Sequence, residues 1–360
     1  MSAVRPGLLE CSNSMNTAPI LAVAPPRPHS VFPGLLLAMA IGLLALLLGD
    51  REPLIGGPVF GIVLGALARN LFSPGERFDP GIRFGGQQVL QWSIVMLGFG
   101  LSLSQVARTG LESLWVTAVT MSMAFLAARL LGRGLGVHHK LAVLIGVGTA
   151  ICGGSAIAAV TPIIRPDDHD TAFAISTIFL FNLVAVLVFP LLGHLMHLSD
   201  HGFGLWAGTA INDTSSVVAA GYSYSHAAGN YATIVKLTRS TLIIPVSLVL
   251  AFYVATREKR RHKQRKHVGD FSLARIFPWF ILWFLVASAA RTAGLIPGDT
   301  LPALHIVAEF MIIVALTAIG LAANLRRMAS TGLRPILLGL GVWVVVAASS
   351  LLVQLGMGQL

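Results

Sequence analysis

The sequence predicts an all-α, polytopic membrane protein with about eleven transmembrane helices, some of them discontinuous, arranged in inverted repeats. The first observation is composition: 55% of the 360 residues are hydrophobic and 11% are charged, against about 25% charged residues in a soluble domain. The second is a series of apolar runs, each about 20 residues long, that leave no room for a soluble domain. The third is a pair of Gly-rich stretches, at 148–159 and 208–220, that interrupt these runs.

The predicted spans follow the apolar runs in chain order, and each is long enough to cross a hydrocarbon core of about 30 Å. Residues 1–30 lack a continuous apolar run and contain Pro25, Pro26 and Pro28. They are expected to form a disordered cytoplasmic tail before a transporter domain at 31–360. The spans are expected at 32–49, 55–72, 87–107, 112–132, 140–164, 171–195, 203–221, 230–255, 276–294, 302–324 and 335–357.

Basic residues gather in alternate connections, a pattern that orients a membrane protein with its basic loops in the cytoplasm. Seven of the 25 Lys and Arg residues lie at 257–266, within a predicted basic cytoplasmic loop at 257–275 that also contacts anionic lipid. The pattern predicts a multi-pass membrane protein with its N-terminus in the cytoplasm and its C-terminus outside. The connection at 195–202 departs from it, because it should be cytoplasmic yet holds histidines and Asp200 instead of Lys or Arg.

The two Gly-rich stretches read GTAICGGSAIAA at 148–159 and GTAINDTSSVVAA at 208–220. Irregular backbone occurs at membrane depth only where it is buried in protein or lines a cavity. Each stretch fits either a broken span or a re-entrant hairpin, and in simple spans the two copies would run parallel rather than inverted. We expect both stretches to line a substrate site, with donors offered at a helix N-terminus by Cys152, Gly153, Gly154 and Ser155.

Asp213 lies near the middle of the seventh span, where an ionised carboxylate costs about 2.5–3.5 kcal/mol on insertion scales. Thr209, Asn212, Asp213 and Ser216 are spaced i, i+3, i+4 and i+7, so they share one helical face. Asn212 and Ser216 are expected to bind substrate and Asp213 to bind the coupling ion. A helix interface of small polar residues is the alternative for Thr209 and Ser216.

Lys236 and Arg239 are three residues apart in the eighth span and lie on neighbouring turns of one face. Arg239 is about 12 Å along the helix from Tyr231, close to the middle of the hydrocarbon core. Both cations are expected to bind an anionic substrate, because the planar guanidinium suits an oxyanion. The alternative is an ion pair of Arg239 with Asp213 that serves folding alone.

Three further polar residues are weaker candidates for the site. Gln88 and Gln91 share a face near the start of the third span, where they line the cavity or bond across helices. Glu309, four residues after His305 in the tenth span, is a candidate titrating group. No metal or cofactor is predicted. No nucleophile–base pair or protease motif indicates an enzyme.

Five stretches resemble the YeiH-like bacterial inner-membrane proteins, a group of proposed sulfate exporters. The resemblance implies a transporter related to the cation–proton antiporter and bile-acid symporter superfamily, with discontinuous helices that cross at the centre. It implies site roles for Cys152 to Ser155, Asp213, Lys236 and Arg239, and it departs at Asn212, where many relatives have His. The stretches are MLGFGLSLS (96–104), AICGGSAIAAVTPII (150–164), GTAINDTSSVVAAGYSY (208–224), VKLTRSTLIIP (235–245) and FPWFILWFL (277–285).

These observations favour a secondary transporter of a small oxyanion such as sulfate or sulfite, coupled to H⁺ or Na⁺. The alternative is a cation/proton antiporter in which Asp213 binds the ion. Expected partners are therefore a small inorganic anion, H⁺ or Na⁺, and membrane lipids, and a homo-oligomer is left open. The net charge of +10 does not indicate nucleic-acid binding, because much of it lies in one topogenic loop.

Overall fold

The computed structural model describes residues 30–52, 56–260, 278–323 and 332–359. The predicted tail at 1–30, all but Ser30, and the basic loop from 261 to 275 lie outside the described residues. Every regular element in the described part is a helix, so the predicted all-α membrane fold is confirmed. By length and composition, six helices could cross a membrane, at Phe32–Arg51, Leu103–Gly134, His169–Leu195, His226–Val254, Gly298–Ala322 and Leu333–Met357.

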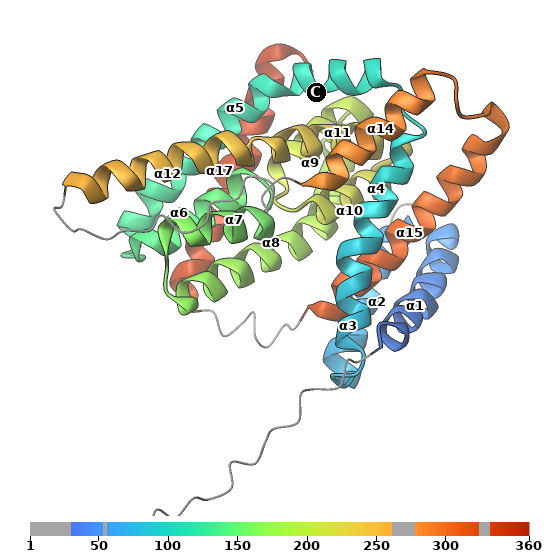
Figure 1. The fold of residues 1–360 in the computed structure, drawn as a ribbon, viewed down its shortest axis with the longest axis horizontal. Helices are drawn as coiled ribbons and strands as arrows, with labels where there is room; N and C mark the ends of the chain where they lie inside the picture. The colour runs from blue at the N-terminus through green and yellow to red at the C-terminus, as the bar shows by residue number, and fades with distance from the viewer. Residues whose placement is uncertain (1–29, 53–55, 261–277, 324–331, 360) are drawn as a thin grey trace, which may run out of the picture.

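Two groups of helices pack against each other (Figure 1). One consists of α1 (Phe32–Arg51), α2 (Gly56–Phe72), α3 (Asp79–Phe84), the π-helix η1 (Gly85–Val89), α4 (Leu90–Gly98), α14 (Trp279–Thr292), the 3₁₀-helix η2 (Gly298–Thr300) and α15 (Leu301–Ala322). The other consists of α5 (Leu103–Gly134), α6 (His139–Ala150), α7 (Gly154–Ile164), α8 (Asp168–Leu195), α9 (Asp200–Ala210), α10 (Thr214–Tyr224), α11 (His226–Thr241), α12 (Ile243–Arg260) and α17 (Leu333–Met357).

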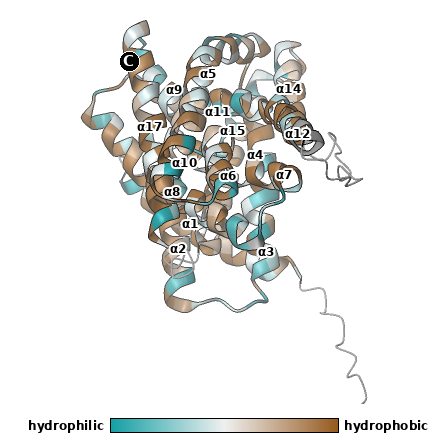
Figure 2. Ribbon diagram, turned by 90° about the vertical axis from the view of Figure 1, so that its left-hand side faces the viewer, coloured by the Kyte–Doolittle hydropathy of each residue, from teal (hydrophilic) through white to brown (hydrophobic). Residues whose placement is uncertain are grey.

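Small residues set the closest packing in the first group. A Cβ added at Gly61 of α2 would lie 2.9 Å from Oγ1 of Thr317 in α15, and one at Gly57 would lie 2.7 Å from Cδ1 of Ile313. Such small-residue contacts are how membrane helices approach closely without a hydrophobic driving force between them. Hydrophobic residues extend over most helices (Figure 2). Large apolar side chains such as Phe72 and Leu111 are exposed.

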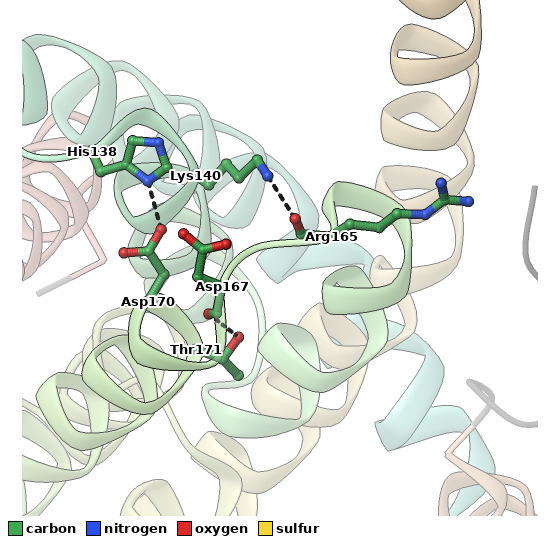
Figure 3. A network of polar contacts seen from close by, with 6 residues as sticks. All are labelled: His138, Lys140, Arg165, Asp167, Asp170 and Thr171. Atoms are coloured by element: carbon green, nitrogen blue, oxygen red, sulfur yellow. Dashed lines mark hydrogen bonds and ion pairs between the residues drawn. The ribbon is translucent and has the colours of Figure 1, made fainter. Parts of the chain in front are cut away.

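The first Gly-rich stretch forms a re-entrant hairpin of α6 and α7. Lys140 Nζ, at the start of α6, donates to the carbonyl oxygen of Arg165, just after α7, at 2.6 Å (Figure 3). A Cβ added at Gly148 would lie 3.0 Å from Cδ1 of Ile157, so α7 runs back beside α6. The chain therefore leaves this hairpin on the side where it entered.

The second Gly-rich stretch forms a hairpin of α9 and α10 in the same way. Ser225 Oγ, just after α10, donates to Asp200 Oδ1 at the start of α9, at 2.7 Å. The rings of Phe203 and Tyr224 stack with centroids 3.9 Å apart and hold the two helices together near the open end. Of the two arrangements left open by the sequence, the structure therefore has hairpins at both stretches.

Helix α8 shows that the two hairpins open on opposite sides. Its first turn lies beside the open end of α6–α7, where His138 Nδ1 and Asp170 Oδ2 are 2.6 Å apart (Figure 3). Its last turn lies beside the open end of α9–α10, where the rings of His194 and Tyr224 stack at 4.3 Å. The 28 residues of α8 span about 42 Å between these points.

The hairpins also explain why the Gly-rich stretch at 148–159 is repeated at 208–220. The α7 and α10 helices begin at 154 and 214, so each hairpin and the long helix after it recur 60 residues later (214 − 154). Because the hairpins enter from opposite sides, the two GTAI copies are inverted, and the parallel arrangement expected of simple spans does not arise. The 195–202 connection consequently lies on the other side of the molecule from Lys140 and Arg165. The expectation that it lies on the same side as the basic loops is therefore wrong.

Candidate substrate site at the hairpin tips

The two hairpin tips, Ile151–Gly153 and Ile211–Asp213, meet in the interior of the second helix group. Gly153 has φ +69° and ψ −131°, a conformation that glycine adopts readily, and a Cβ added there would lie 3.3 Å from Cβ of Asp213. Both tips lie beside the middle of α8, where Asn182 Oδ1 accepts from the Asp213 backbone N–H at 3.2 Å. The Gly-rich stretches therefore come together as the sequence predicts.

Lys236 of α11 joins the two tips from a fully buried position. Its ammonium donates to the carbonyl oxygen of Ile151 at 2.9 Å and to that of Ile211 at 3.0 Å. A third, short hydrogen bond goes to the carbonyl oxygen of Asn212. All three protons of the ammonium are matched by these carbonyl groups, which α6 and α9 leave without helical partners.

Arg239, one turn further along α11, is also fully buried and repeats this role. Its Nε donates to the carbonyl oxygen of Ala150 at 2.6 Å, and its Nη2 donates to that of Thr149. On the other hairpin, Nη1 donates to the carbonyl oxygens of Thr209 and, at 3.4 Å, of Ile211. The guanidinium therefore spans the C-terminal ends of both α6 and α9.

These contacts exclude one of the two roles considered for the cations, the ion pair of Arg239 with Asp213. Neither meets a carboxylate: the three ion pairs among the described residues are Arg69–Asp79, Arg108–Glu112 and His138–Asp170. The ion pair of Arg239 with Asp213, held open as an alternative, is absent from this part of the chain. Both cations instead cap helix C-termini, where the helix dipole favours positive charge. Their substrate-binding role stays a prediction, and the hydrogen bonds described above go to main-chain carbonyl oxygens.

The N-terminal ends of α7 and α10 face the same junction and differ in one respect. Asp213 is the N-cap of α10, and its carboxylate accepts from the backbone N–H of Ser215 at 3.0 Å and from the Ser215 hydroxyl. Gly153 is the N-cap of α7 and makes no side-chain cap hydrogen bond. Ser155, in the first turn of α7, is exposed, whereas Asp213 is half-buried. The first turn of α7 thus has no carboxylate cap of the kind that Asp213 gives to α10.

The remaining predicted residues divide between the tips and other places. Cys152, Asn212 and Ser216 are buried at the tips, and Asn212 Oδ1 has no hydrogen-bond partner. Gln88 lines a separate pocket of about 390 Å³ beside Arg83 and Glu76.

Two weaker candidates and one further residue lie on other helices. Gln91 is exposed on α4, and Glu309 lies on α15 beside His226. Asn182 is a site residue that the sequence analysis missed, although a single Asn inside a long apolar helix is a signal that could have identified it.

Comparisons with known proteins identify the family. The family model described as conserved hypothetical protein 698 matches residues 33–339. A membrane protein of Streptococcus mutans named as UPF0324 is 44% identical over 336 residues, which cover 91% of this chain and 96% of the relative. The chain belongs to the UPF0324 membrane protein family. UPF0324 relatives from Streptococcus agalactiae and Clostridium tetani are 42% and 40% identical and cover 91% and 90% of this chain, and 97% and 95% of their own lengths.

The UPF0324 family match includes both hairpins, α8 and α11, so the junction of the tips lies within the part of the chain shared with the family. The names of these relatives describe membrane proteins. That agrees with the multi-pass helical fold described above. The resemblance to the YeiH-like proteins is consistent with UPF0324 membership.

Proposed function

We propose that this protein is a secondary transporter that moves a small inorganic oxyanion, such as sulfate or sulfite, across the bacterial inner membrane. One observation carries the proposal: Lys236 and Arg239 occupy the carbonyl ends of α6 and α9, while the N-terminal end of α7 has no side-chain cap beside an exposed Ser155. Free N–H groups at a helix N-terminus bind anions readily, because the donors and the dipole both favour negative charge.

The charges at the junction favour an anion over a cation. Clustered backbone carbonyl oxygens are the groups that coordinate Na⁺ in transporters with broken helices. Here those of Ile151, Ile211 and Asn212 already hold the Lys236 ammonium. A second cation would meet repulsion from two fixed positive charges, against one carboxylate at Asp213. An anion near the tip of α7 is attracted by the two cations, whose charge exceeds that of the single carboxylate.

Asp213 is the proposed site of the coupling ion, H⁺ or Na⁺. Its carboxylate is half-buried and lies at the point where the two tips touch, so its charge acts on both. Protonation or Na⁺ binding there would remove a negative charge from beside the anion. A cation/proton antiporter that uses Asp213 alone is the rival function, and the experiment below separates the two.

The opposed hairpins support transport by alternating access. Each hairpin closes over the junction from one side of the molecule, and α8 runs past both tips. Movement of either hairpin would open the junction to one side only. Lys140 and Arg165 at one open end and Asp200 at the other give the charge asymmetry of a protein whose α6–α7 side faces the cytoplasm. On this orientation the N-terminus is cytoplasmic and the C-terminus periplasmic.

The test places a negative charge at the proposed anion site without removing a structural contact. Ser155→Asp should preserve or slightly raise stability, by about 0.3–1 kcal/mol, since an acidic residue suits the first turn of a helix. It should lower the flux of labelled sulfate into proteoliposomes by at least about tenfold, because the carboxylate repels the anion at short range. Ser155→Asn is the matched control, because Asn has nearly the same shape as Asp but carries no charge.

Two results would defeat the proposal. The first is sulfate flux in a folded Ser155→Asp protein equal to that of Ser155→Asn. The second is proton flux that appears on adding Na⁺ or K⁺ in the complete absence of a transported anion, which would assign the protein to cation/proton antiport. Binding measurements with a panel of anions on the purified protein then identify the substrate.

A further inference from the structure

A cluster of metal-ligating side chains lies away from the hairpin tips, where α11 and α15 begin. His226 is the first residue of α11, and His305 and Glu309 lie in the first turns of α15. The four-residue spacing puts His305 and Glu309 on one face of α15. One ligand atom from each of the three side chains lies within 4.8 Å of the others.

The separation of the two histidines fits a metal ion between them. His305 Nε2 and His226 Nδ1 are 3.4 Å apart. Two nitrogen ligands held about 2.0–2.1 Å from a tetrahedral Zn²⁺ are separated by about 3.3–3.4 Å. The Glu309 carboxylate provides a third ligand atom within reach of the same point. Two imidazoles and one carboxylate suit Zn²⁺ better than Ca²⁺ or Mg²⁺, which take oxygen ligands.

The surroundings hold the ligands in place and leave a path for the ion. The ring of Tyr222 contacts that of His226 edge-on, with centroids 6.0 Å apart, and the Tyr222 hydroxyl donates to Asn230 Oδ1 at 2.6 Å. His226 is exposed, and His305 and Glu309 are half-buried. An exposed histidine beside two half-buried ligands gives a metal access from the solution at this end of the molecule.

We propose that His226, His305 and Glu309 bind a divalent transition metal such as Zn²⁺, with water as the fourth ligand. No metal was expected from the sequence, and His226 lies 79 residues before His305 with no spacing motif that connects them. The bound ion would join α11, in the helix group that contains both hairpins, to α15, in the group that contains α1 and α2. It would restrict the movement of these two groups relative to each other. This site is independent of the transported substrate.

The experiment uses the full-length protein, purified in detergent with any affinity tag removed. Calorimetry with Zn²⁺ and absorption spectroscopy with Co²⁺ should show one site per chain, with the intense visible bands of tetrahedral Co²⁺. His305→Ala and Glu309→Gln should each weaken Zn²⁺ binding by at least about tenfold. Loss of a residue that only supports a ligand already weakens metal binding by about 10–100-fold, and loss of a direct ligand should cost no less. His201→Ala is the control, because the ring of His201 contacts that of Tyr231 at the same end of the molecule and His201 belongs to no cluster of three ligands among the described residues.

Thermal unfolding separates loss of the site from loss of the fold. Zn²⁺ should raise the unfolding temperature of the wild-type and His201→Ala proteins and leave that of His305→Ala unchanged. Wild-type protein that binds no Zn²⁺ at micromolar concentration would overturn the proposal. A folded His305→Ala protein that keeps wild-type affinity would overturn it as well.

Discussion

The ammonium of Lys236 lies 2.9 Å from the carbonyl oxygen of Ile151, in a hairpin that precedes it by 85 residues. The same nitrogen donates to Ile211 and Asn212 of the other hairpin. A buried charge is costly unless every donor finds an acceptor, and here three carbonyl oxygens supply that compensation. Lys236 therefore joins the tips of the two hairpins through hydrogen bonds to their main-chain carbonyl oxygens.

Removing this side chain should destabilise the protein strongly. Lys236→Met keeps much of the volume but leaves up to three buried carbonyl groups unpaired, at about 1–3 kcal/mol each. We expect a loss of about 2–5 kcal/mol, measured as a lower midpoint of thermal unfolding in detergent. Lys140→Met is the control, since Lys140 makes a single exposed hydrogen bond to Arg165 and its loss should cost less than about 1 kcal/mol. Equal effects of the two substitutions would contradict the role assigned to Lys236.

The neighbouring glycines 153 and 154 should respond in opposite directions to the same substitution. Gly153→Ala forces a side chain into φ +69°, with its Cβ 3.3 Å from Asp213 Cβ, and should cost about 1–3 kcal/mol. Gly154→Ala lies in the first turn of α7, with the nearest atom, Cε2 of Phe179, 3.8 Å away. It should be neutral or stabilise by about 0.5–1 kcal/mol. Unfolding midpoints of the pair measure both effects, and a neutral Gly153→Ala would show that the tip tolerates another backbone geometry.

The sequence predicted the contents of the junction well. Gly, Asp, Lys and Arg inside apolar segments are unfavourable in lipid, so Gly153, Asp213, Lys236 and Arg239 had to gather in the interior. That prediction follows from the cost of polar and charged groups in lipid and requires no knowledge of the tertiary structure. It also identified the two Gly-rich stretches as partners, which the contact of Gly153 with Asp213 confirms.

The direction of the hairpins and the partners of the cations could not be predicted in this way. The turn at Ile151–Gly153 depends on the backbone angles of three residues, and the same letters fit a span that continues across the membrane. Lys236 and Arg239 bind main-chain carbonyl oxygens, and every residue carries such a group, so no pattern of side chains marks the partner. Asn182 likewise accepts from a main-chain group, the N–H of Asp213, so its partner could not be read from side chains.

The hairpin topology predicts which positions face the same solution. Single cysteines at Lys140 and Asp167 should react with a membrane-impermeant maleimide from one side, and those at Asp200 and Ser225 from the other. The background for these variants is a protein with Cys11 and Cys152 replaced by serine. If α6–α7 and α9–α10 crossed the membrane as simple spans, Asp167 would label from the side opposite Lys140, and Asp200 from the side opposite Ser225. Labelling of intact cells and of inverted vesicles distinguishes the two patterns.

Asp213→Asn separates the capping role of this residue from the proposed coupling role. An Asn side chain still accepts from the Ser215 N–H, so the stability of α10 should change by only a few tenths of a kcal/mol. Asp213→Ala removes the cap and should cost about 1 kcal/mol. In proteoliposomes the Asn variant should keep sulfate binding but lose the dependence of flux on an imposed pH or Na⁺ gradient, because it cannot gain or lose a charge. If flux through the Asn variant follows those gradients as the wild-type flux does, Asp213 only caps the helix, and the coupling ion binds elsewhere.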